Sequence, residues 1–306
     1  MAQASRLDGK VVAVTGSGRG IGRAIALLAA SRGAQVVVND LGGSSTGEGS
    51  DRGPAHDVVA EIRAAGGEAV ANTADITDPD AARSIIDDAL SHFGRIDGVV
   101  NNAGFLRDVI FHKMDTDDFE AVVRVHLFGS FNVARAAAPE FRAQGSGAYV
   151  HFSSASGVIG NLAQANYAAA KMGIIGLSNS IALDMRRFGV RSNVMVPFAW
   201  SRLIGTLPTE TPEQQARVEK FQAMSPEKIA PMIVFLLSDD AAEVTGQIFS
   251  VRNNEISVFS PIRPIRTIHR SEGWTADSIA DHMLPALRTN FSPLQMSADV
   301  FSWDPV

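Results

Sequence analysis

The sequence contains no cysteine among its 306 residues. This absence excludes disulfide bonds, zinc held by cysteine, iron–sulfur clusters and catalysis by a thiol. The sequence also lacks a run of about 18 apolar residues, so no membrane-spanning helix is expected. The first apolar run, at residues 11–14, is too short for the core of a secretory signal, and a soluble cytoplasmic protein is expected.

An excess of positive charge is also missing. Lys and Arg number 27 against 33 Asp and Glu, which gives a net charge of −6. Without a long basic run, nucleic acid is not expected as a partner. Apolar residues make up 45% and charged residues 20% of the chain, which is ordinary for a globular protein with a large core and excludes a mainly disordered one.

Short β-branched runs alternate with alanine-rich amphipathic segments. Strands are expected at residues 11–14, 35–38, 68–71, 96–100, 148–152, 190–196 and 247–251. Helices are expected at residues 21–30, 58–65, 79–93, 117–144, 164–188 and 226–237, with Pro231 kinking or shortening the last. Apolar strands separated by helices predict an α/β fold, a Rossmann-type doubly wound parallel sheet of about seven strands with helices on both faces.

The end of the chain does not continue this alternation. Residues 256–306 carry five prolines and are too short for an independent domain. One helix is expected there, at residues 276–284, with Thr275 as its N-cap and Pro285 as its end. We therefore predict a Rossmann domain at residues 1–255 and a C-terminal extension at residues 256–306 that packs on the body or on a neighbouring subunit.

A glycine-rich turn comes between the first strand and the first helix. Glycine lets the backbone approach a pyrophosphate, and a helix N-terminus offers free N–H groups with a positive partial charge. The pattern predicts a dinucleotide site made of Gly16, Ser17, Gly18, Arg19, Gly20 and Ile21.

Asp40 ends the second strand, where a carboxylate accepts hydrogen bonds from ribose hydroxyls and repels a 2′-phosphate. It therefore favours NAD over NADP, whereas Arg19 mildly favours NADP. The alternative for Asp40 is an ordinary turn residue.

Polar and small residues follow the next two strands as well. Asp75, with Ile76 beside it, could accept from the adenine amino group, or could equally cap a turn or helix. Asn102, Ala103 and Gly104 suit close packing against a cofactor, although a plain loop is the alternative.

The strongest motif combines Ser154, Tyr167 and Lys171. Tyr167 and Lys171 are four residues apart on an expected helix, so they share one face. A nearby ammonium favours the phenolate and lowers the pKa of a phenol toward working pH, so Tyr167 can move a proton to or from a substrate oxygen. Ser154 ends the fifth strand and can hydrogen-bond the same oxygen, and Lys171 can also hold the nicotinamide ribose.

Over about residues 8–252 the sequence resembles the short-chain dehydrogenase/reductase family. The matching stretches are the glycine turn, residues 101–104, and Ser154 through Tyr167 to Lys171. The resemblance implies an NAD(P)-dependent oxidoreductase, usually a dimer or tetramer built on the two long helices. It also implies that Pro197, after the sixth strand, lies against the cofactor.

Four stretches are similar to a narrower group within that family, the (3R)-hydroxyacyl-CoA dehydrogenase domains of type 2 peroxisomal multifunctional enzymes. Actinobacterial relatives of this group are sometimes called 17β-hydroxysteroid dehydrogenases. The stretches are residues 37–43, 101–108, 125–131 and 160–167.

One departure from the family pattern is His126, at a position where most members have an asparagine that holds a water near the lysine. His126 could relay a proton, because histidine titrates near neutrality, or it could be a packed structural residue. We count it among the catalytic candidates with Ser154, Tyr167 and Lys171.

Gln164, Phe198, Trp200 and Leu203 are the substrate candidates. Their aromatic and aliphatic members suggest an apolar pocket, and loop packing is the alternative. Arg263, Arg266, His269 and Arg270 could meet the phosphates of coenzyme A or form a solvated surface.

Together these features predict an enzyme that oxidises a secondary alcohol with NAD, or reduces the ketone. A 3-hydroxyacyl-CoA, including a sterol-derived one, is the expected substrate, and a free hydroxysteroid is the alternative. A non-catalytic NAD(H) sensor is the alternative of another class. No metal is expected.

Overall fold

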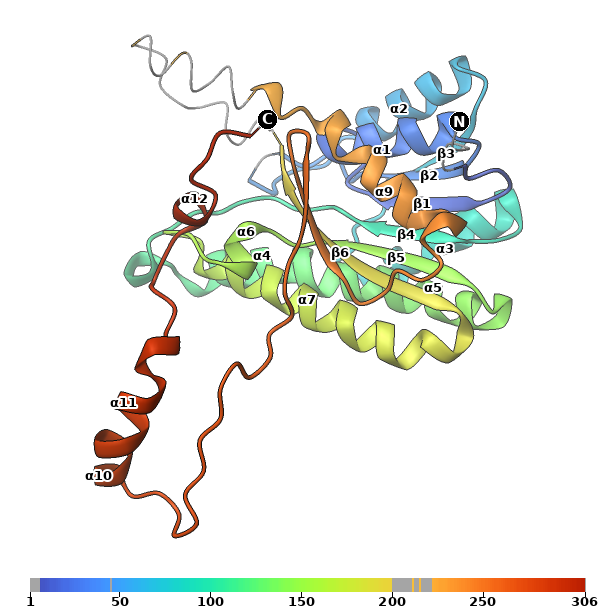
Figure 1. Ribbon diagram of the computed structural model, residues 1–306. Helices are drawn as coiled ribbons and strands as arrows, with labels where there is room; N and C mark the ends of the chain where they lie inside the picture. The colour runs from blue at the N-terminus through green and yellow to red at the C-terminus, as the bar shows by residue number, and fades with distance from the viewer. Residues whose placement is uncertain (1–5, 45, 200–210, 212–214, 216–221, 306) are drawn as a thin grey trace.

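The computed structural model describes residues 6–44, 46–199, 211, 215 and 222–305. The described residues form one eight-stranded sheet in the order β3-β2-β1-β4-β5-β6-β7-β8 (Figure 1). The strands are β1 (Val11–Thr15), β2 (Gln35–Asn39), β3 (Glu68–Asn72), β4 (Gly98–Asn101), β5 (Gly147–Phe152), β6 (Val190–Phe198), β7 (Ile248–Arg252) and β8 (Glu255–Val258). All neighbours are parallel except β7 and β8.

The helices are α1 (Gly20–Ser31), α2 (Gly53–Ala64), α3 (Pro79–Phe93), α4 (Thr116–Val123), α5 (Gly129–Gln144), α6 (Ala155–Val158), α7 (Ala165–Met185), α9 (Ala230–Leu237), α10 (Ala276–Ser278), α11 (Leu284–Leu287) and α12 (Ser297–Val300). None of the described helices is long and apolar enough to cross a membrane.

Two apolar cores lie on the two faces of the sheet. Successive strand side chains point to opposite faces, so Val12 and Val14 of β1 join the core under α1, α2 and α9. Val11 and Ala13 join the core under α3, α5 and α7. The doubly wound α/β fold expected from the sequence is confirmed. The strands are apolar on both faces because helices cover both faces of the sheet.

The eighth strand was not expected. It pairs with β7 through a tight hairpin whose turn residue Asn253 has a φ of 56°. Asn253 and Asn254 are turn formers of the kind that mark such hairpins. The strand has only four residues, half of them exposed, so its apolar signal is weak.

Three helices differ from their expected form. α2, expected at residues 58–65, begins five residues earlier, at Gly53, with Pro54 in its first turn. The segment expected as one helix at residues 117–144 is interrupted by a π-helical stretch, Arg124–Phe128, between α4 and α5. An apolar pattern does not reveal such a local widening. Pro231 lies in the first turn of α9, so the α-helix there is shortened rather than kinked.

The C-terminal extension leaves the body and returns to it. After β8 the chain runs outward to α10 and α11, and then comes back through α12 (Figure 1). Thr275 caps α10 as expected. Pro285, expected to end the helix, instead lies in the first turn of α11, just after the π-helical stretch Ile279–Met283. A proline needs no N–H partner in a first turn, so the helix continues.

Candidate functional site

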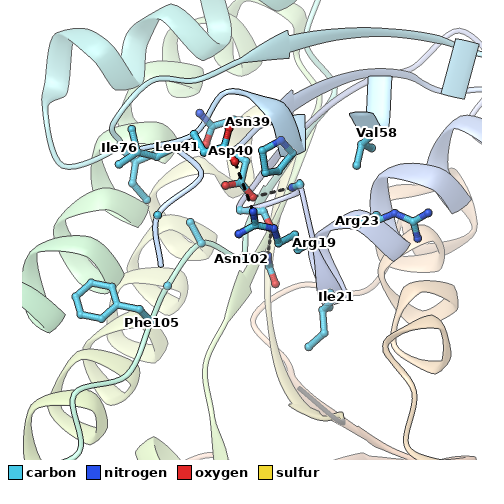
Figure 2. A pocket seen from close by; sticks show the side chains of 18 of the residues that line it. Arg19, Ile21, Arg23, Asn39, Asp40, Leu41, Val58, Ile76, Asn102 and Phe105 are labelled. Atoms are coloured by element: carbon cyan, nitrogen blue, oxygen red, sulfur yellow. Dashed lines mark hydrogen bonds and ion pairs between the residues drawn. The ribbon is translucent and has the colours of Figure 1, made fainter. Parts of the chain in front are cut away.

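A cavity of about 1000 Å³ lies at the carboxyl ends of the central strands (Figure 2). The chain crosses from one face of the sheet to the other between β1 and β4, and such switch points are where doubly wound sheets bind ligands. Of the residues predicted to bind the cofactor, eleven line it: Gly16, Gly18, Arg19, Gly20, Ile21, Asp40, Asp75, Ile76, Asn102, Ala103 and Gly104.

The glycine turn is packed so closely that side chains are excluded. A Cβ on Gly18 would lie 2.8 Å from Asp40 Oδ2, and one on Gly22 would lie 2.2 Å from the Gly16 carbonyl oxygen. Asn102 holds the same turn through its side-chain amide, which donates to the carbonyls of Thr15 and Gly16 at 3.0 Å each. The backbone is therefore exposed to a ligand at the start of α1, and this cradle fits a dinucleotide pyrophosphate.

Asp40 is fixed beside this turn by two backbone donors. Its Oδ2 accepts from Gly18 N and its Oδ1 from Gly42 N, each at 2.7 Å. The two arginines of the cavity both face acidic partners: Arg23 lies 2.5 Å from Glu61, and Arg19 lies 3.8 Å from Asp51. Figure 2 shows Arg19 beside Asp40.

The other predicted cofactor contacts do not line this cavity: they are Ser17, Tyr167, Lys171 and Pro197. The Ser17 side chain is fully buried, and its hydroxyl donates to the Val14 carbonyl at 2.7 Å. It thus shapes the turn from inside. Pro197 lies within β6, paired with Val251. Asp75 lines the cavity and also accepts from Thr77 N at 2.9 Å, so it is a turn residue as well.

Several residues that line the cavity were not expected from the sequence. Leu41 and Val58 give the cavity an apolar wall, and Phe105 closes another side (Figure 2). Leu41 directly follows Asp40, so its place at the strand end was a usable signal. Val58 comes from α2 and reaches the cavity only through the packing of that helix.

Ser154, Tyr167 and Lys171 come together near this cavity without lining it; the His126 ring contacts Tyr167 and bonds to Phe105, which does line it. Ser154 lies two residues after the end of β5 and caps α6, where its hydroxyl accepts from Ser156 N at 3.2 Å. Tyr167 lies in the first turn of α7, and Lys171 one turn later. The Lys171 amine donates to the Phe152 carbonyl at 2.7 Å and lies 5.5 Å from the centre of the Tyr167 ring.

Burial governs the proton affinities of this group. It raises the pKa of Tyr167 to about 12, with the charge of Asp108 adding to the rise and a hydrogen bond from Ser154 opposing it. It lowers the pKa of Lys171 to about 7. The net shift for Tyr167 is opposite to the one expected from the spacing alone, because burial and the charge of Asp108 outweigh the hydrogen bond from Ser154.

His126 is locked by the protein. Its Nε2 lies 2.8 Å from the Phe105 carbonyl oxygen, to which it donates, and its ring meets the Tyr167 ring edge-on at 5.1 Å. Burial and the charge of Lys171 hold the pKa of His126 well below its ordinary value, so the ring is neutral. Its Nδ1 is buried without a hydrogen-bond partner in the described residues. This environment fits a packed residue at least as well as a relay.

The substrate candidates are divided by the structure. Gln164, close in sequence to Tyr167, is hydrogen-bonded to Ser156 and to Asp108. Phe198 ends β6 and packs against Phe301, with ring centres 4.8 Å apart. Trp200 and Leu203 lie outside the described residues. The basic residues of the extension lie in its outward-running part, where Arg270 pairs with Glu272 at 3.4 Å.

A dinucleotide cavity at the switch point, with a serine, a tyrosine and a lysine beside it, defines a nicotinamide-dependent dehydrogenase. Residues 16–253 match the family model described as enoyl-(acyl carrier protein) reductase. The chain belongs to the short-chain dehydrogenase/reductase family. It is an enzyme that acts on the CH–OH group, and the prediction of an enzyme is confirmed; a non-catalytic sensor is set aside.

Two relatives of the chain have names that describe an enzyme. The chain is 43% identical to mouse peroxisomal multifunctional enzyme type 2 over 284 residues, which is 92% of this chain and 37% of that protein. The chain thus spans well under half of that multifunctional relative. It is 39% identical over 267 residues to the hydroxyacyl-CoA dehydrogenase ChsB1 of Mycobacterium tuberculosis, covering 83% of this chain and 81% of that one.

Solved structures agree with the fold. A short chain dehydrogenase from Mycobacterium avium matches with a TM-score of 0.82 at 37% identity, covering 95% of this chain and 98% of that one. A 7α-hydroxysteroid dehydrogenase, complexed with NADH and 7-oxo glycochenodeoxycholic acid, matches with a TM-score of 0.72 at 32% identity, covering 81% of this chain and 94% of that one.

Proposed function

We propose that the protein interconverts a 3-hydroxyacyl-CoA, including a sterol-derived one, and its ketone with NAD. The observation that carries the proposal is the meeting of Ser154, Tyr167 and Lys171 beside the dinucleotide cavity. The named activity of the mycobacterial hydroxyacyl-CoA dehydrogenase supports the substrate class.

The chain's own residues divide the work. Tyr167 removes the proton of the alcohol, and Ser154 holds the same oxygen by a hydrogen bond. Lys171 holds the nicotinamide ribose and, when charged, favours the phenolate of Tyr167. When bound, NAD accepts the hydride, and its oxidised ring carries a positive charge that also favours the phenolate.

The cavity favours NAD over NADP. Asp40 places a carboxylate at the end of β2, and both cavity arginines already face acidic partners. A 2′-phosphate would find no unpaired cation among the described lining residues and would be repelled by Asp40. NADP is therefore the less favoured cofactor.

A free hydroxysteroid is the second candidate substrate. It is favoured by the structural match to the 7α-hydroxysteroid dehydrogenase and by the aromatic contact of Phe198 with Phe301. The deciding experiment follows reduced cofactor by absorbance, with NAD and NADP, against panels of hydroxyacyl-CoA thioesters and hydroxysteroids. We expect NAD and a thioester to give the highest kcat/KM. A strong preference for a steroid would overturn the thioester assignment.

We also propose a homodimer or homotetramer built on α5 and α7. Phe128, just before α5, and Phe131 in its first turn are 56% and 47% exposed, and Leu183 near the end of α7 is 77% exposed. Large exposed apolar side chains on two neighbouring helices are typical of a subunit interface. The body of residues 1–255 and the extension of residues 256–306 are the two proposed parts, and the outward-running part of the extension packs on a neighbouring subunit.

A further inference from the structure

The end of the extension is bonded to the loop that precedes the catalytic tyrosine. The backbone N–H of Ser297 donates to the Gly160 carbonyl at 3.1 Å, and the Ser297 hydroxyl donates to Asn161 Oδ1 at 2.7 Å. Figure 1 shows α12 lying beside α6, far along the chain from it. The loop of residues 159–164 is thus held by a segment 136 residues further along the chain.

This loop has a backbone that needs external support. Ala163 has a φ of 61° and Gly160 a φ of 128°. The left-handed region costs a residue with a side chain about 1 kcal/mol, so it persists where surrounding contacts determine it. The Ala163 carbonyl accepts from Val109 N at 2.9 Å. Val109 and Ser297 therefore hold the loop from two sides.

A series of hydrogen bonds runs from the extension to Asp108 and passes beside the catalytic Ser154. Asn161 Nδ2 donates to Ser156 Oγ at 2.8 Å, and Ser156 Oγ donates to Gln164 Oε1 at 2.6 Å. Gln164 Nε2 then donates to Asp108 Oδ2 at 2.9 Å. Asn161, Ser156 and Gln164 each accept one of these hydrogen bonds and donate the next one. The series ends at the carboxylate of Asp108. Bonds arranged in this order strengthen one another.

Two catalytic residues, Ser154 and Tyr167, interact with members of this hydrogen-bond series. The hydroxyl of Ser156 lies 3.4 Å from that of Ser154, and Ser156 N donates to Ser154 Oγ. Asp108, at the far end, raises the pKa of Tyr167. This hydrogen-bond series therefore contacts Ser154 and influences Tyr167, the two groups proposed to bind the substrate oxygen.

The same segment also supports Phe198, one of the substrate candidates. Phe301 packs on Phe198 at 4.8 Å and on Trp303 at 5.5 Å between ring centres. Arg252, on β7, donates to the carbonyls of both Phe301 and Trp303. Phe198 is thus backed by the extension of its own chain.

We infer that residues 297–303 are a positioning element of the alcohol-binding cleft, with Ser297 and Asn161 as positioning residues and Phe301 as the support of Phe198. The inference rests on the proposed function for its effect on turnover. The hydrogen bonds from Ser297 to the loop of residues 159–164 do not depend on any substrate.

The test compares Ser297→Ala, Ser297→Thr and Ser302→Ala in the full-length chain. Ser302 is exposed in the same segment and is the matched control. Hydrogen exchange of the amides at residues 157–163 is measured first, without substrate. We expect Ser297→Ala to raise their exchange rates by about 3- to 10-fold, the effect of one hydrogen bond. Ser297→Thr keeps the hydroxyl and should match the parent, as should Ser302→Ala.

Kinetics then test the role in the cleft. Ser297→Ala should raise KM for the alcohol by about 3- to 10-fold and leave KM for NAD unchanged, because the dinucleotide cavity lies on other elements. Unchanged exchange, or equal changes in both KM values, would overturn the inference. A parent chain that oxidises no alcohol would overturn the proposed function instead, and the exchange measurement would still decide whether the extension holds the loop.

Discussion

Tyr149 and Tyr167 are the two tyrosines of the chain, and their surroundings give them different roles. Tyr149 is 1% exposed on β5 and donates its hydroxyl to the Ala134 carbonyl at 2.8 Å. Tyr167 is half-buried at the cleft, beside Ser154 and Lys171. The first phenol is used for packing, whereas the second is placed for proton transfer.

Replacing each tyrosine with phenylalanine separates these roles. Tyr167→Phe removes the proton acceptor and should lower kcat by about 100- to 10,000-fold with little loss of stability. Tyr149→Phe should lower the free energy of unfolding by about 1 kcal/mol and leave kcat unchanged. Steady-state kinetics and urea denaturation measure both effects. Equal loss of activity in the two variants would contradict the assignment.

Lys171 is expected to lower the stability of the fold while being required for activity. Its pKa falls from 10.5 to about 7 on burial, so burying its charge destabilises the fold fully below pH 7, and this cost disappears as the pH rises to 10.5. Lys171→Met should therefore abolish activity yet raise stability more at about pH 6 than at about pH 9. Thermal melts at the two pH values measure this, with the exposed Lys113→Met as a control that shows no such difference. An equal gain at both would argue against a buried charge.

Asp108 is expected to influence the pH profile. Burial is the main cause of the raised pKa of Tyr167, and the negative charge of Asp108 adds to the rise by disfavouring the phenolate. Asp108→Asn should therefore shift the rising limb of kcat/KM for alcohol oxidation to lower pH. Asp117→Asn, at an exposed position on α4, should leave the limb in place. A shift to higher pH in Asp108→Asn would contradict the stated sign.

At the scale of elements, the turn between β1 and α1 depends on glycine at defined places. A Cβ on Gly18 would lie 2.6 Å from Pro54 Cβ and 2.8 Å from Asp40 Oδ2, whereas one on Gly43 would meet its nearest atom at 3.6 Å. Both glycines line the cavity, so they form a matched pair that separates local crowding from a general effect of added volume.

Gly18→Ala should weaken NADH binding by about 10-fold or more, because the turn must shift away from Asp40. Gly43→Ala should change the Kd by less than about 3-fold. Titration by cofactor fluorescence measures both values. Equal Kd values for the two variants would mean that the close packing of the turn is not needed for binding.

At the scale of the whole molecule, the exposed apolar side chains of α5 and α7 bear on assembly. Leu183→Asp places a charge in the proposed interface and should shift the protein toward monomers in light scattering after size-exclusion chromatography. Ala60→Asp, at an exposed position of α2 on the other face of the sheet from α5 and α7, should leave the mass unchanged. A monomeric parent protein would remove the basis for the proposed interface.

The sequence by itself determined the fold class and indicated eleven of the residues that line the cavity. Continuous apolar strands and helical spacing fixed the doubly wound sheet, because both faces of a parallel sheet must be covered. The glycine turn and the four-residue spacing of Tyr167 and Lys171 are local patterns, so they could be recognised without knowing any distant contact.

Tertiary structure alone decided the proton affinities and the long-range supports. Burial reversed the expected shift in the pKa of Tyr167, and acidic neighbours from other elements paired with Arg19 and Arg23. Ser297 reached Asn161 across 136 residues. Each of these depends on which distant segments pack together, and no local pattern of residues specifies that.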